Sequence, residues 1–284
     1  MRIPRHFILL LGFCLFALPA LNNAVLADDA APVKVRLQAA IVEGAKPLKD
    51  DIKWSIAPLS KGGTAAQEVT KAAPEVRLAP GKYRVTATLG FATAARDITV
   101  AEAGKQELVF DAGWAHFQMV LSRKAKPIKD NVRWTIYRFT GGGVDEKAKL
   151  SELTAPSAQL ILPKGWYMVR AKYQGIVSEL AAEVKAGTLY NYTIVAYAGK
   201  LTFAVVDAKG KAVKKDVLWS IERVSKANGG KRVSVVTDSA ALQSLLLGEG
   251  KYVVVVKAGD RTGEVPFDIK ADRDTKLTVM LKLH

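Results

Sequence analysis

Cysteine and histidine are almost absent from this chain of 284 residues. The single cysteine, Cys14, lies in an apolar N-terminal stretch that we expect to be removed, so the exported chain would contain no thiol. This excludes disulfide bonds, thiolate catalysis and cysteine-ligated metals. Beyond that stretch only His116 and His284 remain, which are too few for a histidine-rich zinc site or a recognisable catalytic triad. We therefore predict no metal, no cofactor and no enzymatic activity.

The sequence also lacks a transmembrane helix. The apolar run at residues 7–21 is about 15 residues long, whereas a helix that crosses a bilayer needs roughly 20. Arg2 and Arg5 precede this run and a small-residue cleavage site ends at Ala27, which is the pattern of a secretory signal peptide. We predict a signal peptide at residues 1–27, cleaved after Ala27, no transmembrane segment after cleavage, and a periplasmic or secreted destination.

What the sequence does contain is one pattern repeated three times. A Lys-rich turn followed by a tryptophan strand recurs with its tryptophans 80 and 85 residues apart. The three copies are Lys46–Ile56 with Trp54, Lys126–Ile136 with Trp134, and Lys211–Ile221 with Trp219. We therefore predict three domains after the signal peptide, at residues 28–112, 113–198 and 199–284.

In each copy the tryptophan alternates with aliphatic residues on one face of a strand. Ile52, Trp54 and Ile56 share a face, and Lys53 and Ser55 lie on the other. Period two is typical of a half-buried strand, and burial of an indole ring removes roughly 150–250 Å² from water. We predict that Trp54, Trp134 and Trp219 are structural core residues.

A second motif follows each tryptophan and pairs a glycine turn with a tyrosine. Its copies are Leu78–Val85, Leu162–Val169 and Leu247–Val254. The glycines of these turns let the chain reverse tightly: Gly81, Gly165 and Gly250. The tyrosines share strand parity with the following valines, so we expect buried rings whose hydroxyls reach backbone near the turn: Tyr83, Tyr167 and Tyr252.

Counting alternating segments gives about six or seven short strands per repeat and no sustained helix, which predicts antiparallel β-sandwiches. The order strand, turn, strand and then Leu-x-Pro-Gly-x-Tyr-x-Val resembles the bacterial Cna-B-like and carboxypeptidase-regulatory-like sandwiches. The resemblance extends over all three repeats, although the third has Gly248 and Glu249 where the motif has its proline. It implies an all-β protein of three tandem immunoglobulin-like or prealbumin-like sandwiches.

The middle repeat differs from the other two in its aromatic content. It has 11 aromatic residues, against four in each flanking repeat. Parity places Trp166 on the solvent face with Arg170 and Lys172, where a ring beside cations could stack on a sugar with phosphate or carboxylate groups. Tyr190 and Tyr192 share a face of the last strand and complete the predicted ligand-binding set. The alternative is that these aromatics are buried between repeats.

The net charge of +15 points to anionic partners, and export makes nucleic acid an improbable one. We predict a non-catalytic cell-envelope binding or scaffolding protein that contacts an anionic glycan, a lipid or an envelope protein. One alternative is a purely structural, partner-docking periplasmic protein. A carboxylate-dependent hydrolase is a second alternative, although no residue pair is singled out for it.

Overall fold

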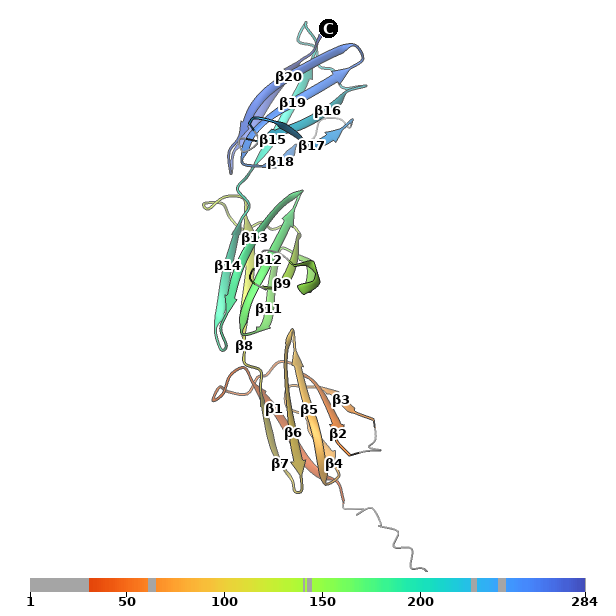
Figure 1. The fold of residues 1–284 in the computed structure, drawn as a ribbon, viewed down its shortest axis with the longest axis vertical. Helices are drawn as coiled ribbons and strands as arrows, with labels where there is room; N and C mark the ends of the chain where they lie inside the picture. The colour runs from red at the N-terminus through yellow and green to blue at the C-terminus, as the bar shows by residue number, and fades with distance from the viewer. Residues whose placement is uncertain are drawn as a thin grey trace, which may run out of the picture.

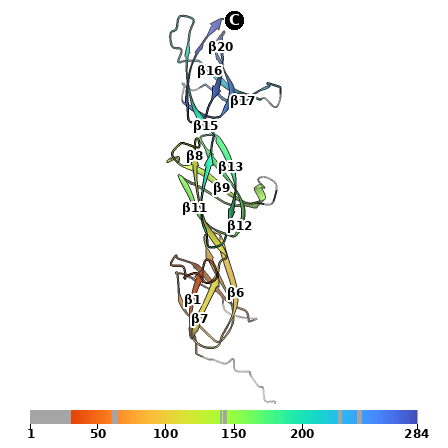
Figure 2. The same ribbon diagram turned by 90° about the vertical axis from the view of Figure 1, so that its left-hand side faces the viewer.

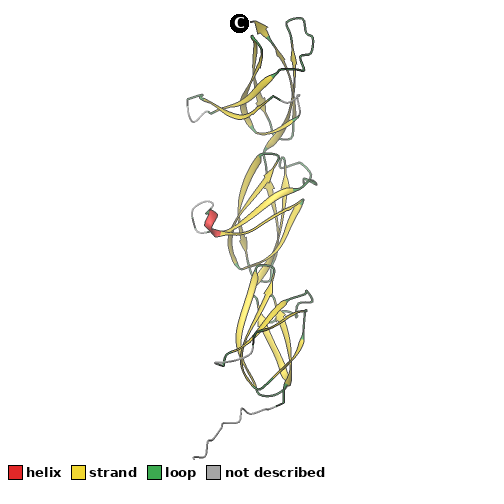
Figure 3. Cartoon of the chain, turned by 90° about the vertical axis from the view of Figure 1, so that its right-hand side faces the viewer, coloured by secondary structure: helices red, strands yellow, loops and turns green. Residues whose placement is uncertain are grey.

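The computed structural model describes residues 31–60, 65–139, 141, 145–225, 229–239 and 244–283. The predicted signal peptide with Cys14, and His284, lie outside these ranges. The described chain forms three β-sandwiches that follow one another end to end along a rod (Figure 1 and Figure 2). The only helix among the described residues is the single 3-10 turn η1 (Glu146–Ala148), which projects from one side of the middle sandwich (Figure 3).

Each sandwich consists of a three-stranded sheet that faces a larger one. In the first, the order β4-β1-β7 faces β3-β2-β5-β6. Its strands are β1 (Val33–Ala40), β2 (Lys53–Pro58), β3 (Gln67–Thr70), β4 (Glu75–Leu78), β5 (Gly81–Leu89), β6 (Ala92–Val100) and β7 (Gly104–Val109).

The second sandwich repeats this arrangement, with β11-β8-β14 facing β10-β9-β12-β13. Its strands are β8 (Ala112–Val120), β9 (Val132–Arg138), β10 (Lys149–Ala155), β11 (Ser157–Pro163), β12 (Gly165–Tyr173), β13 (Ile176–Val184) and β14 (Leu189–Val195).

In the third sandwich, β18-β15-β21 faces β17-β16-β19-β20-β22. Its strands are β15 (Ala198–Val206), β16 (Leu218–Val224), β17 (Arg232–Asp238), β18 (Leu245–Gly248), β19 (Gly250–Ala258), β20 (Arg261–Ile269), β21 (Asp274–Met280) and the short β22 (Lys282–Leu283). The predicted fold class, all-β with three tandem sandwiches, is confirmed. The first two sandwiches have seven strands each, within the six or seven predicted from the alternating segments, and the third has eight.

One feature of the pairing was not predicted. In each three-stranded sheet, the strand that comes first in the chain pairs in parallel with the strand that comes last. These pairs are β1 with β7, β8 with β14 and β15 with β21. All other named strand pairs in the described chain are antiparallel, as expected. The three-stranded sheets are therefore mixed. Sequence alternation reveals the face of a strand but not the direction of its neighbour, so this pairing was not predicted.

Each sandwich has its own core, built around the repeated tryptophan. Trp54 and Trp134 are fully buried and Trp219 is 3% exposed. The indole Nε1 of Trp54 donates to the carbonyl oxygen of Lys71 at 2.9 Å, and that of Trp134 donates to Ala155 at the same distance. The ring thus fills the space between the sheets while its single polar group is satisfied by backbone at the sheet edge.

The tyrosines of the second motif all make the same local contact. The hydroxyls of Tyr83, Tyr167 and Tyr252 donate to the carbonyl four residues earlier, at 2.9, 2.6 and 2.7 Å. Tyr167 and Tyr252 are buried, whereas Tyr83 is only half-buried. The bond links the strand that follows the turn to the backbone that precedes it. The glycines of the three turns, Gly81, Gly165 and Gly250, have φ values of 158°, 150° and 159°.

The two junctions between sandwiches use equivalent backbone contacts. Asp111 and Tyr197, which precede β8 and β15, both have left-handed backbones, with φ of 52° and 48°. The carbonyl of Asp111 accepts from the N–H of Lys164 at 3.0 Å, and the carbonyl of Tyr197 accepts from the N–H of Glu249 at 2.7 Å. Lys164 and Glu249 each precede the glycine of the second motif, so the same bond recurs at both junctions.

Side chains fill the junctions at matching positions. Ile161 and Trp114 of the second repeat pack against the first core, and Leu246 of the third repeat packs against the second core. Ile161 and Leu246 each precede the leucine of the second motif, where the first repeat has Arg77. A backbone bond from the N–H of Phe91 to the carbonyl of Ile161, at 3.1 Å, closes the first junction.

Candidate functional site

The predicted ligand-binding residues lie mainly on the outer face of the sheet β10-β9-β12-β13. Strand β12 alternates, so Tyr167, Val169 and Ala171 point into the core. Trp166 lies on the opposite face and is 50% exposed, and Lys172 is exposed on the same side of the strand. Both side chains are thus exposed, on the face that strand parity predicted for them.

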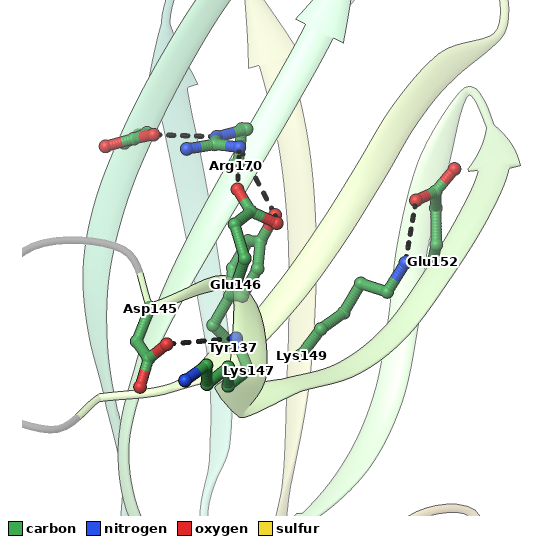
Figure 4. Close-up of polar contacts among 8 residues, drawn as sticks. Tyr137, Asp145, Glu146, Lys147, Lys149, Glu152 and Arg170 are labelled. Carbon is green, nitrogen blue, oxygen red and sulfur yellow. Dashed lines mark hydrogen bonds and ion pairs between the residues drawn. The ribbon is translucent and has the colours of Figure 1, made fainter.

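Arg170 lies between them but is already occupied by protein groups (Figure 4). Its Nη1 donates to Glu146 Oε1 at 2.7 Å, and its Nε donates to Glu179 Oε1 at 2.7 Å. The guanidinium carbon lies 5.4 Å from the centroid of the Tyr137 ring, and the Tyr137 hydroxyl donates to Glu146 Oε2 at 3.0 Å. Two carboxylates thus neutralise the cation that was predicted to meet an anionic ligand.

The 3-10 turn η1 carries Glu146 to this position. Asp145 caps the turn, since its Oδ1 accepts from the backbone N–H of Lys147 at 2.9 Å. Tyr137 faces outward on β9 but is only 2% exposed. Burial and the bond to Glu146 raise the pKa of Tyr137, so its hydroxyl stays protonated and keeps donating at neutral pH.

Two further cations on this face are also paired with a carboxylate. Glu152 contacts Arg133 at 3.3 Å and Lys149 at 3.5 Å. Of the cations on the outer faces of β9 and β12, only Lys172 forms no ion pair with a described carboxylate. The face is therefore of mixed charge, and Trp166 and Lys172, at opposite ends of β12, are what remains exposed of the residues predicted there.

Tyr190 and Tyr192 do not join this surface. They lie on β14, in the opposing sheet, and stack on each other with ring centroids 5.7 Å apart. Tyr192 also stacks on the buried Phe117 at 5.3 Å, and its hydroxyl donates to the carbonyl of Glu183. Both rings thus line the inner side of the sandwich, so the structure separates them from Trp166.

Arg170→Gln is expected to destabilise the second sandwich in a pH-dependent way. Hydrogen bonds from Arg170 and then from Tyr137 lower the pKa of Glu146 below its ordinary value of 4.5. A lowered folded-state pKa contributes stability that is fully present above pH 4.5 and is lost as the pH falls through the folded value. Amide hydrogen exchange in β9 and β12 should therefore show faster opening of the variant at neutral pH, and a smaller difference from the native protein near about pH 2.

The control for this variant is Arg133→Gln, which removes a cation of the same face whose single, exposed ion pair is to Glu152. It should change exchange little at either pH. An equal effect of both variants at neutral pH would contradict a special role for the Arg170 network.

The metal-ligating side chains are dispersed over the described residues. Within those ranges no three His, Cys, Asp or Glu side chains converge. His116 lies on a strand face, where its Nδ1 is 3.2 Å from Asn191 Oδ1. Asp130 accepts from the Tyr173 hydroxyl at 2.7 Å, and burial together with this bond raises the pKa of Tyr173 to about 12.

Sequence reasoning missed two glycines that the structure shows to be essential for close packing. A Cβ atom on Gly113 would collide with the carbonyl oxygen of Lys185, and one on Gly199 would collide with that of Lys270. Both glycines occupy the second position of their first strand. An alignment of the three repeats shows glycine at this position in the second and third repeats and Val33 in the first. This difference is the sequence signal that could have drawn attention to the two glycines.

Comparison with known proteins identifies one family model. Residues 200–281 match the Rhizobiales growth-associated tandem repeat domain. The match lies within the third sandwich, and no curated protein matches the chain. Within the described residues, no helix has the length and apolar character that crossing a membrane requires.

Several solved structures are similar to this chain, pilins among them. The Bacillus anthracis TIE protein is 17% identical with a TM-score of 0.26, and the match covers 89% of this chain and 51% of that one. A streptococcal ancillary pilin is 12% identical over 88% of this chain and 99% of its own, with a TM-score of 0.32. BcpA, the major pilin subunit of Bacillus cereus, is 13% identical over 89% and 100%, with a TM-score of 0.25. This chain thus spans about half the length of the TIE protein.

Proposed function

We propose that the protein is a non-catalytic scaffold of the cell envelope, periplasmic after export, that holds a partner-docking surface on a semi-rigid rod. The observation that carries this proposal is the equivalence of the two junctions. Both place a left-handed residue, Asp111 or Tyr197, at the link and bond its carbonyl to the turn of the next sandwich. A short link that is fixed by hydrogen bonds limits the rotation of one sandwich relative to the next. A rigid spacer needs this limit, whereas a flexible tether lacks it.

The positions of aromatic residues in the middle repeat also support a scaffold. Trp114 packs at the first junction, Tyr137 is covered by η1, and Tyr192 stacks on Phe117. These rings therefore contribute to packing within the middle sandwich and at its junction with the first. This favours the structural, partner-docking interpretation over a broad carbohydrate platform.

Small-angle scattering of the exported protein tests the rod. A compact chain of this length would have a radius of gyration of roughly 18 Å, and the rod should give a distinctly larger value. Ile161→Asp with Leu246→Asp places charges in both junctions and should broaden the distribution of interatomic distances. A compact native particle, or a distribution unchanged by these substitutions, would overturn the proposal. In the envelope, the same variant should lose its association with partners while its sandwiches stay folded.

Trp166 supports a second candidate function, binding of an anionic glycan. Its ring is half exposed, and the exposed Lys172, which forms no ion pair with a described carboxylate, lies six residues further along the same strand. Under this candidate, the exported protein should sediment with peptidoglycan or lipopolysaccharide, less so at high salt, and Trp166→Ala should reduce the bound fraction several-fold. Leu189→Ala removes a comparably exposed apolar side chain elsewhere and serves as the control. No sedimentation with either polymer at low salt would exclude the candidate.

A further inference from the structure

The third sandwich has an unprotected sheet edge. Strand β17 is the outermost strand of its sheet, and among the described residues only its inner neighbour β16 pairs with it. Two of its valines are largely in solvent: Val233 is 56% exposed and Val235 is 49% exposed. Val235 also lies at a register shift, where the ladder to β16 skips a residue. An exposed strand with free backbone groups and apolar side chains is a template for pairing with another strand.

The equivalent edges of the other repeats are protected. Strand β3 carries Gln67 and Glu68, and Glu68 pairs with Lys53 at 3.2 Å. Strand β10 carries Lys149 and Glu152, which pair with each other, and η1 lies at its start. Charged residues on an edge are the usual protection against strand pairing. Within β17 itself, the charges stand only at the two ends, at Arg232 and Asp238.

A groove lined by both polar and apolar groups adjoins this edge. It has a volume of about 680 Å³ and lies between β17, β18 and the β12–β13 turn of the second sandwich. Apolar side chains from both repeats line it together with polar groups, and the apolar ones include Ile176, Val177, Val236, Leu245, Leu247 and Tyr252. A strand that paired with β17 would place alternate side chains into this groove.

A cation lies at the rim of the groove. The Arg223 Nη2 donates to the backbone carbonyl of Glu249 at 3.2 Å, and its guanidinium carbon is 6.0 Å from the Tyr252 ring centroid. Arg223 forms no ion pair with any described carboxylate, in contrast to Arg170 in the second sandwich. The exposed Glu249 side chain also lines the groove and would repel an acidic group placed close to it. An occupant therefore gains electrostatic attraction only if its negative charge lies near the Arg223 guanidinium.

We propose that β17 accepts an extended segment of a partner protein by strand addition, with an apolar side chain in the groove and an acidic residue beside Arg223. This deepens the partner-docking part of the proposed function, on which it rests, by giving the partner's chemistry. A second copy of this chain fits less well. In a pair of β17 strands, the only acidic residue that each strand would bring is Asp238, at the end of the strand.

The test uses a synthetic acidic peptide, acetyl-EVTVTVE-amide, and the isotope-labelled exported protein. Titration followed by nuclear magnetic resonance should shift amides of β17 and the groove and slow hydrogen exchange along β17. Val235→Lys should weaken binding about tenfold or more, whereas Val109→Lys, an exposed valine on the edge strand β7, should leave it unchanged. The same peptide with lysine in place of glutamate should bind less tightly, and Arg223→Gln should remove that preference.

Three outcomes would overturn the proposal. They are absence of binding at millimolar peptide, shifts confined to another surface, and an acid preference that persists in Arg223→Gln. Protection of β17 in the free protein that grows with protein concentration would assign the edge to a second copy and also overturn it. None of these outcomes bears on the shape measured by scattering, so failure here and failure of the scaffold proposal are distinguishable.

Discussion

Replacing Trp134 with alanine is expected to lower the free energy of unfolding of the second sandwich by about 3–5 kcal/mol. The ring is fully buried, so its removal leaves a cavity between the sheets that they cannot fill without moving. The substitution also leaves the carbonyl of Ala155 without its indole donor. Native-state hydrogen exchange of amides in β9 and β12 reports the opening of this sandwich separately from its neighbours.

Trp166→Ala, 32 residues further along the same repeat, is the matched control. Its ring is half exposed, and the structure gives its indole nitrogen no partner among the described residues. The expected cost is below about 1 kcal/mol. If Trp166→Ala destabilised the sandwich as much as Trp134→Ala, the assignment of Trp166 to the surface would be wrong.

Gly113→Ala is expected to destabilise the second sandwich by about 1–3 kcal/mol or more. The added methyl group would meet the carbonyl oxygen of Lys185 at less than any normal contact distance and that of Thr188 at 2.9 Å. Both obstacles are backbone atoms of the turn that leads into β14, so neither can rotate aside. The turn would have to move away from β8 and strain the bond from the Trp114 N–H to the Thr188 carbonyl.

Gly104→Ala provides the comparison, because nothing lies within 4 Å of the position that its methyl group would take at the start of β7. Its effect should stay within about 0.5 kcal/mol. Gly199→Ala should reproduce the Gly113 result in the third sandwich, where Arg273 takes the place of Thr188 at 2.9 Å. Thermal unfolding of the three variants, with hydrogen exchange to locate the change, checks the series. Equal melting of Gly113→Ala and Gly104→Ala would show that the turn yields freely.

Local patterns predicted the parts of this fold that depend on strand parity. Alternation around Trp54 and Tyr167 indicates which side chains face the core, because neighbouring residues of a strand point to opposite sides. The same rule placed Trp166 on the surface. These properties belong to single strands, so one repeat of the sequence contains enough information to read them.

The contacts of Arg170 could not be predicted in this way. Its partner Glu146 comes from a loop before β10, and Glu179 comes from β13. Parity assigns a side chain to a face without saying which charged groups from other elements share that face. The role of Arg170 therefore changed from a free cation to the centre of an ion-pair network. The parallel pairing of first and last strands was missed for the same reason.

That parallel pairing determines how the rod would respond to tension. The chain enters the first sandwich through β1 and leaves it after β7, and the two strands are hydrogen-bonded neighbours that run in the same direction. Pulling on the two ends of the rod would slide these strands past each other and load their hydrogen bonds together, in shear. A hairpin pulled at its open end would instead lose its bonds one after another. Since β8 with β14 and β15 with β21 share this arrangement, every sandwich of the rod is built to bear load along its length.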